Sequence, residues 1–552
     1  MKEESNMKKR SMIALLLTAF LLAGMMFGCA DGPADAGSLG ETEGEEELKA
    51  MIGTYPIADE QNPLTLKIWS TMGDVIANDI KDFNDILAFQ EMEERTGIHI
   101  EWEHAVSGQD TEAFNLMLAT RDLPDLIRNN IGSAGKEAIK YVQDDVIIDL
   151  SPYMEYAPNF KGILDENADL YRQLADDNGG VYFFPSLNMD VRTRVYRGFM
   201  IREDWCDDVG MEIPSNTDEL YEVLKAWQDQ DVNGNGKKDE VFSGCGSNDF
   251  LVYNLLWCFG SHYGFQLKDG EVTHGLLTEE FKEGMAYIAK LYEEGLIDPD
   301  FLTNDTTKWE SKFISEEAGV AYGIASRIDK FNKNVADSNF VPIAKLNGPE
   351  GRTGYTYDNT ITNIYKTQQT VCITTANENV EKSMMWMDYV YSPEGEILFN
   401  LGVEGISYEI GEDGKPHYTE ALTNDPQGRP QNQMQLLYAP GGSQWPVNVT
   451  MDALYCQKTD IELNAFETYS SNIPETSEIL PPFTLTEEEM SSITSKLTDV
   501  NTYVDEALGS LAIGKISIEE IDTVVIPRLE SLGIGDVLDV YQIAYERYMS
   551  KA

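Results

Sequence analysis

Leu64-Thr-Leu-Lys-Ile-Trp-Ser70 alternates apolar and polar side chains, which is the pattern of a β-strand with one buried face. Helical periodicity follows over 79–96 and stops at Gly97, after which 98–104 (IHIEWEH) alternates again. A helical stretch over 112–120 and a short apolar run at 123–127 complete the series. Strand, helix, strand, helix, strand is typical of a βαβ layer with a parallel sheet, so we expect an α/β fold.

The pattern starts again much later, with alternation at 370–375 (TVCITT) and a helix over 380–391 that Ser392-Pro393 should end. Residues 181–202 have the mixed extended character of a segment that crosses between lobes. About 490 residues are too many for one core and enough for two lobes. The predicted division is an N-lobe from 61–181 and 354–426 and a helix-rich C-lobe from 182–353 and 427–552.

An export signal stands at the start of the chain. Basic residues (Lys8, Lys9, Arg10) precede an apolar run that ends at Gly28-Cys29. The run is short for a bilayer core, so we predict a removable signal peptide over 1–28 and palmitate-type lipidation of Cys29; an uncleaved anchor helix is the alternative. Residues 29–60 are predicted to be a disordered acidic tether. The expected location is the extracellular face of a cell membrane of Gram-positive type, with the lipid as the only membrane contact.

The charge balance excludes some partners. The chain has 41 Lys and Arg against 95 Asp and Glu, a net charge of −54. Nucleic-acid binding depends on cations that neutralise phosphates, so no nucleic-acid partner is expected. Five cysteines remain beside Cys29, without CxxC spacing, which predicts neither a disulfide framework nor a thiolate metal site.

Several segments, taken in order, resemble a known family. They are the Gly-Cys export signal, LATRDLPDLI (118–127), IREDW (201–205), WMDYVYSPEGEILFNLGVEGISYEI (386–410) and the ending at 526–548. Together they are similar to the extracellular solute-binding lipoproteins (family 1) of bacterial ABC importers, in the branch that binds oligosaccharides and other glycans. The resemblance implies a two-lobe periplasmic-binding-protein-like α/β fold with a ligand cleft between the lobes and several hinge crossings.

The resemblance also implies a function. The protein would capture a small glycan outside the cell, close around it as a monomer and deliver it to ABC permease subunits in the membrane. A secreted glycan hydrolase or lyase is an alternative, but 95 acids make paired carboxylates uninformative, and neither HExxH nor GxSxG is present. We therefore expect no enzyme. A ligand-sensing surface lipoprotein that is not coupled to transport is a further alternative.

A calcium loop is the sharpest chemical motif. Asp231-Val-Asn-Gly-Asn-Gly-Lys-Lys-Asp-Glu240 has oxygen-bearing side chains at positions 1, 3, 5 and 9 and glycine at position 6. Phe242 stands at position 12, so Glu240 is predicted to close the site, in agreement with the shortened loop of calcium-bearing members of the resembled family. An Asn-Gly surface turn without metal is the alternative. The predicted ligands of a structural Ca²⁺ are Asp231, Asn233, Asn235, Asp239 and Glu240 by side chain and Lys237 by its carbonyl.

A glycan cleft needs aromatic platforms and polar side chains that can pair with hydroxyls. Trp69 ends the first strand, and Trp445 lies in a Gly- and Pro-rich loop that cannot easily bury it. Arg202 could bind a hydroxyl or carboxylate, with an ion pair inside the lobe as an equal alternative. Core packing is the alternative for the tryptophans. The predicted ligand contacts are Trp69, Arg202, Trp257, Tyr322, Tyr357 and Trp445.

Overall fold

The computed structural model describes residues 43–105, 108–130, 135–245, 251–344, 346–352, 361–471 and 479–551. Residues 50–552 form one compact unit. The predicted signal peptide, Cys29 and Tyr357 lie outside the described residues. No helix in the described ranges combines the length and the apolar character that a membrane crossing requires.

The first sheet begins with β1 (Leu64–Ser70), which lies between β2 (Ile98–Glu103) and β3 (Leu126–Asn129) and runs parallel to both. Leu66 and Ile68 of β1 are fully buried, whereas Lys67 between them is exposed, as the alternation predicts. α3 (Leu87–Thr96) and α4 (Asp110–Thr120) connect these strands. The predicted parallel βαβ layer is confirmed.

The same sheet is completed by a strand from much later in the chain. β11 (Tyr365–Ile373) lies between β3 and β4 (Phe184–Leu187) and is antiparallel to both, which gives the order β2-β1-β3-β11-β4. The strand starts five residues before the predicted alternation, because its first residues pair with β4, as Tyr365 does with Leu187. We call the part built on this sheet the N-lobe.

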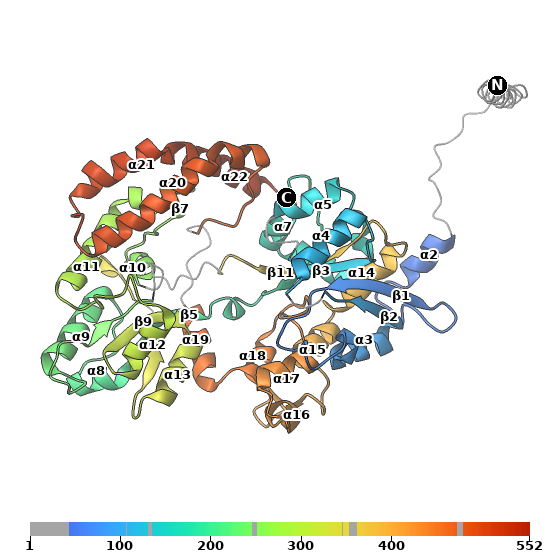
Figure 1. Ribbon diagram of the computed structural model, residues 1–552, viewed down its shortest axis with the longest axis horizontal. Helices are drawn as coiled ribbons and strands as arrows, with labels where there is room; N and C mark the ends of the chain where they lie inside the picture. Colours follow the sequence, from blue (N-terminus) through green and yellow to red (C-terminus); the bar gives the residue numbers. More distant parts are fainter. Residues whose placement is uncertain are drawn as a thin grey trace, which may run out of the picture. The chain divides into compact units, whose positions relative to one another are not determined.

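A second sheet has the order β10-β5-β9-β6 and forms the basis of the C-lobe. β5 (Arg197–Arg202) is antiparallel to β9 (Ala318–Ile324) and β10 (Phe340–Pro342), and the short β6 (Val241–Phe242) is parallel to β9. Its core includes Trp205 and Trp227, whose rings meet edge to face 5.2 Å apart. The chain thus has the predicted two-lobe α/β fold (Figure 1).

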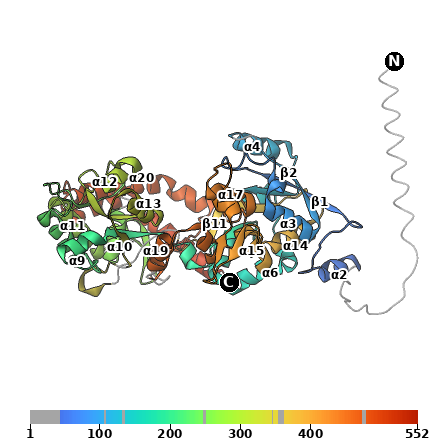
Figure 2. The same cartoon turned by 90° about the horizontal axis from the view of Figure 1, so that it is seen from below.

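Helices cover both sheets. In Figures 1 and 2, α3, α14 and α15 group with β1 and β2, whereas α9, α10 and α11 group in the other lobe. The described helices not yet bounded are α2 (Glu43–Ala50), α5 (Gly135–Gln143), α6 (Pro158–Glu166), α7 (Ala168–Leu174), α8 (Glu203–Val209), α9 (Thr217–Gln230), α10 (Val252–Cys258), α11 (Glu279–Glu293), α12 (Thr306–Ile314), α13 (Ser326–Asn334), α14 (Val380–Tyr389), α15 (Pro393–Leu401), α16 (Glu420–Thr423), α17 (Gln431–Tyr438), α18 (Met451–Gln457), α19 (Asp460–Ser470), α20 (Glu487–Ala512), α21 (Ile526–Leu532) and α22 (Ile534–Ser550). Two hairpins, β7–β8 (Phe265–Lys268, Glu271–His274) and β12–β13 (Tyr408–Ile410, Pro416–Tyr418), complete the set.

The structure differs from the predicted tether. Residues 43–50 form α2, and Ile57 and Ala58 are buried, with both backbone N–H groups donating to the carbonyl of Thr96 at 2.8 and 3.1 Å. The tight approach also explains Gly97: a Cβ there would lie 1.8 Å from the carbonyl oxygen of Ala58. The folded part therefore begins earlier than residue 61.

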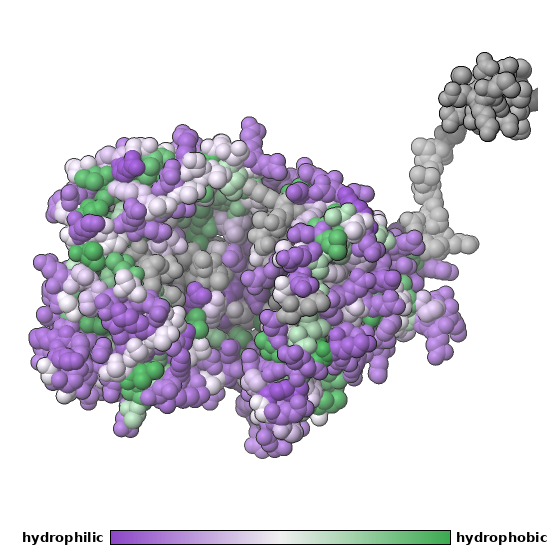
Figure 3. Space-filling model, in the orientation of Figure 1, coloured by the Kyte–Doolittle hydropathy of each residue, from purple (hydrophilic) through white to green (hydrophobic). Residues whose placement is uncertain are grey.

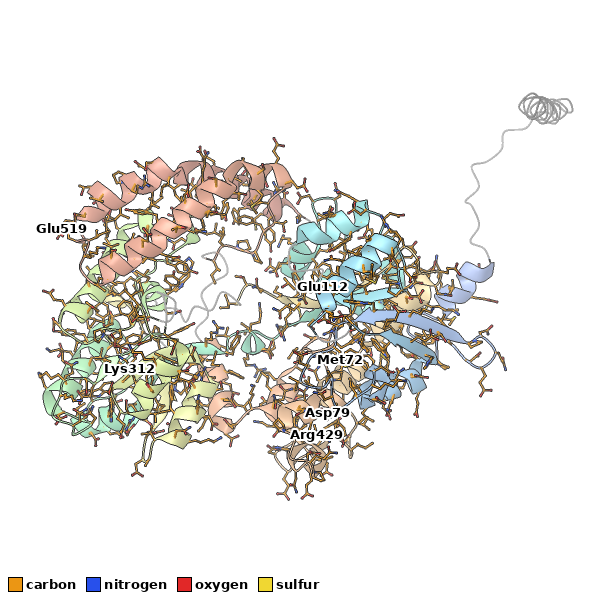
Figure 4. The ribbon with its side chains drawn as sticks, in the orientation of Figure 1. Met72, Asp79, Glu112, Lys312, Arg429 and Glu519 are labelled. Atoms are coloured by element: carbon orange, nitrogen blue, oxygen red, sulfur yellow. The ribbon has the colours of Figure 1, made fainter. Side chains whose placement is uncertain are left out.

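Two segments that we predicted in the C-lobe contact the N-lobe in the structure. β4 pairs with β11 in the N-lobe sheet, and α17 packs against α3 while α18 packs against α15. An ion pair of 3.0 Å between Asp79 and Arg429 joins the same region to the residues after β1 (Figure 4). Residues 184–187 and 429–457 thus contact the N-lobe, although we predicted them in the C-lobe. The exact lobe bounds stay predictions.

Candidate functional site

Three segments lie side by side where the chain crosses between the sheets. Leu187, at the end of β4, donates its N–H to Val447 and accepts from the N–H of Val449, both at 2.8 Å. The next residue, Asn188, donates its N–H to the carbonyl of Ile364 at 2.8 Å. The segment after β4, the segment before β11 and the segment before α18 therefore meet at one place.

A cavity of about 640 Å³ opens beside these crossings. Its walls come from the β4–β5 connection, the end of β9, the start of β11 and the α18–α19 region, so both lobes contribute. The lining residues are Asn188, Thr193, Arg194, Tyr196, Ile324, Ala325, Ser326, Asn363, Tyr365, Lys366, Thr367, Gln368, Leu454, Lys458, Glu462 and Phe466.

The lining combines aromatic rings with groups that form directed hydrogen bonds. Tyr196, Tyr365 and Phe466 supply the rings, and amides and hydroxyls supply neutral donors and acceptors. Tyr365 is held against Phe183, with ring centroids 6.0 Å apart, and its burial raises the pKa of the phenol to about 12. The phenol therefore keeps its proton at neutral pH and can donate a hydrogen bond. Such a mixture suits a ligand with both apolar faces and polar rims.

The charged groups of the cavity are mainly basic. Lys366 donates from Nζ to the carbonyl of Gly442 at 3.1 Å, and Arg194 donates from Nη1 to the carbonyl of Ile361 at 2.7 Å. Burial lowers the pKa of both side chains. Lys458 lies 3.8 Å from the carboxylate of Glu462. The cavity thus gathers three cations and one carboxylate in a chain of strongly negative net charge.

Residues 87–399, more than half of the chain, match the model of the bacterial extracellular solute-binding protein family. The chain belongs to this family. The matched residues include β2, β3, the whole second sheet and β11, so they contain three of the four walls of the cavity.

Two relatives of this solute-binding protein extend the match to most of its length. The fructooligosaccharide ABC transporter substrate-binding protein FusA of Streptococcus pneumoniae is 26% identical over 533 residues, which cover 92% of this chain and 94% of FusA. Lipoprotein LipO of Bacillus subtilis is 28% identical over 340 residues, 58% of this chain and 63% of LipO.

A solved structure agrees with the fold. An EF-hand mutant of FusA from S. pneumoniae in complex with fructo-nystose has a TM-score of 0.63 and 24% identity, and the match covers 88% of this chain and 100% of that chain. At this identity the likeness shows the fold. It supports the two-lobe architecture described above.

We predicted six ligand contacts from the sequence. None of the five that the structure describes lines this cavity. Trp69 is 5% exposed and packs against Phe114, and Trp257 is 5% exposed beside His262. Tyr322 lies on β9, two residues before Ile324 of the cavity wall. Their contact with a ligand stays a prediction.

The environments of Trp445 and Arg202 differ from those that we predicted from the sequence. The loop that was expected to leave Trp445 exposed buries it completely, because Phe89, Trp102 and Trp386 surround its ring at 5.1–5.9 Å. Arg202 forms the ion pair inside the lobe that was the alternative: Nε donates to both carboxylate oxygens of Asp204 at 2.8 and 2.9 Å. Its guanidinium also lies over the Trp205 ring.

Sequence reasoning missed the cations of the cavity. Residues 191–197 (VRTRVYR) contain three arginines in seven residues of the crossing segment, which is unusual for so acidic a chain. This local cluster of positive charge could have indicated that the crossing segment contributes cations to a binding site. Lys366 and Lys458 have no comparable signature, since each is a single lysine in a polar stretch.

The predicted calcium loop turns tightly in the structure. Asp231, Gly234 and Gly236 have positive φ angles of 51°, 70° and 78°. The Asp231 carboxylate accepts the N–H of Gly236 at 3.0 Å, and the side-chain amides of Asn233 and Asn235 each donate to Asp239 at 2.9 Å. In the described part of the chain no three His, Cys, Asp or Glu side chains converge as a metal cluster.

Glu240 gives the loop an unbalanced negative charge. Its side chain is fully buried, and Oε2 has no hydrogen-bond partner among the described residues. Burial, and then the neighbouring Asp239 and Asp231, raise the pKa of this carboxyl. The other oxygen, Oε1, accepts the N–H of Asn233 at 3.4 Å. A buried carboxylate oxygen without a donor is costly, and a hard cation is the partner that would offset the cost. The donor set therefore fits calcium.

Proposed function

We propose that this chain is the substrate-binding lipoprotein of an ABC transporter, which captures an oligosaccharide outside the cell and delivers it to membrane permeases. The cavity at the lobe crossings is the observation that carries the proposal, because aromatic rings and polar side chains from both lobes meet there. FusA, which matches nearly the whole chain, is named for binding fructooligosaccharides.

Capture would proceed by lobe closure. The crossing after β4 contacts both the crossing before β11 and the segment before α18 through backbone hydrogen bonds, so these segments form a short hinge about which the lobes can turn. Closure would bring the β9 and α19 walls toward β11 and remove the ligand from water. Because no step changes a covalent bond, the product delivered is the ligand that was bound.

Calorimetry tests the proposal. The chain from residue 43 onward is titrated with a panel of neutral and acidic oligosaccharides. We expect saturable binding to at least one, and binding up to about tenfold weaker by Tyr365→Ala, which removes an aromatic contact worth about 0.5–1.5 kcal/mol. Tyr545→Ala on α22, outside the cavity, is the matched control.

Two results would reject the proposal. The absence of binding to every saccharide would remove the sugar ligand, and cleavage of a bound oligosaccharide, seen by chromatography after incubation, would favour the hydrolase or lyase.

We also propose that Cys29 carries the lipid anchor. The export signal, the name of the relative LipO and the family's extracellular character support this location. In a bacterial host, labelled palmitate should enter the full chain but not Cys29→Ser, and the variant should appear in the medium. Retention of Cys29→Ser in the membrane would support an uncleaved anchor helix instead.

Finally, we propose a structural Ca²⁺ held by Asp231, Asn233, Asn235, Asp239, Glu240 and the carbonyl of Lys237. The buried Oε2 of Glu240 supports it. A chelator should lower the melting temperature and added calcium should restore it. Glu240→Gln should lose the calcium response, whereas Asp229→Asn, on a neighbouring exposed carboxylate, should keep it. A melting temperature that responds to neither chelator nor calcium would support the surface turn without metal.

A further inference from the structure

The charge of the cavity contrasts with the charge of the chain. Acidic residues outnumber basic ones by 95 to 41 overall, and hydrophilic residues cover most of the face drawn in Figure 3. Within the cavity lining the balance is reversed, with Arg194, Lys366 and Lys458 against Glu462. The positive charge of the cavity is therefore opposite in sign to the net charge of the whole protein, which sets the electrostatic potential around it.

The one carboxylate among the described lining residues is already engaged. Glu462 accepts the N–H of Thr459 at 3.0 Å and its hydroxyl at 3.3 Å, which closes the capping box at the start of α19. The same carboxylate lies 3.8 Å from Lys458. Glu462 thus has a structural role and partly neutralises Lys458, and it is not paired with Lys366.

Lys366 carries the inference. Its side chain is half-buried, and among the described residues the ammonium has one hydrogen-bond partner, the neutral carbonyl of Gly442, and no ion pair. An ammonium has three donors, and removal from water is costly unless a negative charge is brought close. Lys366 lies in β11 and lines the same cavity as the aromatic side chains of Tyr196 and Phe466.

From this arrangement we infer that the cavity selects an anionic saccharide, whose ring substituent, a carboxylate or a sulfate, pairs with Lys366. The inference rests on the proposed function and names its substrate class. A pyranose ring presents its face to an aromatic side chain while a charged substituent projects from its edge, which matches a cavity lined by both aromatic rings and Lys366. Arg194, whose guanidinium fork can bind two oxygens, lies in the same lining.

The test compares ligands that differ only in charge. The full chain with Cys29→Ser is titrated calorimetrically with oligogalacturonate, its methyl ester, a sulfated oligosaccharide and a neutral fructooligosaccharide. The methyl ester keeps the ring and removes the negative charge. We expect the acid or the sulfated sugar to bind at least about 30-fold more tightly than the neutral compounds, because truncating one partner of a buried charge pair has effects of this size.

Variants assign the effect to Lys366. In Lys366→Met the ratio of acid to ester affinity should fall toward one, and Lys366→Arg should keep most of it. Lys161→Met, which removes one exposed cation from α6 of the N-lobe, should leave the ratio unchanged and so controls for net charge.

The outcomes are distinct. Preference for the sulfated sugar over the uronate would identify sulfate as the substituent. Equal or tighter binding of the neutral compounds by the unsubstituted protein would overturn the inference and leave the proposed function intact. A preference that survives in Lys366→Met would overturn the assignment to Lys366. Failure of every saccharide to bind would remove the proposed function as well.

Discussion

Trp445 belongs to an aromatic cluster that holds a loop onto the N-lobe. We expect Trp445→Ala to lower the free energy of unfolding by about 3–5 kcal/mol, because a fully buried ring is removed from between Phe89, Trp102 and Trp386. Trp445→Phe should cost much less, since the indole Nε1 has no hydrogen-bond partner among the described residues. Denaturant unfolding measures both. Equal stability of the alanine variant would mean that the ring is not packed in solution.

Asp388 is a buried acid that stabilises another helix. It accepts the backbone N–H of Phe160 at 2.8 Å and the Asn159 amide at 2.7 Å at the start of α6, and burial raises its pKa from 3.8 to about 6. The folded state therefore holds this proton at a pH at which the unfolded chain has released it. Stability from this group is present at low pH and falls as pH rises from about 4 to about 6.

The variant Asp388→Asn isolates this effect. The difference in free energy of unfolding between the original protein and the variant should fall by up to about 3 kcal/mol from pH 4 to pH 7, which is the size of a shift of about two pKa units. Urea unfolding at several pH values measures it. A difference that does not change with pH would contradict the raised pKa.

At the scale of elements, α19 links helix capping to the cavity. Thr459 begins this helix in a capping box with Glu462, and α19 brings Glu462 and Phe466 to the cavity wall. Thr459→Ala should cost about 1 kcal/mol of stability and also weaken ligand binding, because the first turn of α19 loosens. Thr486→Ala, in the equivalent capping box of α20 outside this cavity, should cost similar stability without weakening binding. Melting and calorimetry of the pair decide whether the cap acts on the site.

Individual elements show what a sequence can predict. β1 was predicted with its observed bounds because apolar and polar side chains alternate over 64–68, where exposed residues alternate with more buried ones. The helix expected over 79–96 begins only at Leu87, since Asp82 caps a short 3₁₀ turn over 83–85 and Ile86 is extended. The helix predicted over 380–391 ends at Tyr389, before Ser392, and Ser392 instead caps the start of α15 by accepting the N–H of Gly395. Periodicity finds elements, whereas caps that depend on side-chain geometry set their limits.

The cavity was less predictable than the fold. Arg194, Lys366 and Lys458 come from crossings far apart in sequence, and each lysine by itself looks like an ordinary surface residue. The predicted aromatic contacts were chosen for exposure in loops, which tertiary packing overrides at Trp445. A site made by several crossings depends on how those crossings meet, and local pattern does not contain this information.

For the whole molecule, we expect ligand binding to make the protein more compact. Both lobes line the cavity and adjacent crossings join them, so a ligand that contacts both walls should favour the closed arrangement. Small-angle X-ray scattering of the chain from residue 43 onward should give a smaller radius of gyration with a saturating ligand than without. A sugar that calorimetry finds not to bind is the control. An unchanged radius at saturation would show that capture does not involve closure.

The position of β11 limits the order in which this protein can be made. Because the strand at 365–373 separates β3 from β4, any fragment that stops earlier leaves two strand edges without partners, and such edges invite aggregation. Synthesis and secretion must both pass residue 373 before the first layer can assemble. An isolated amino-terminal piece is therefore a poor choice for expression, and the nascent chain should depend on chaperones until its middle third has emerged.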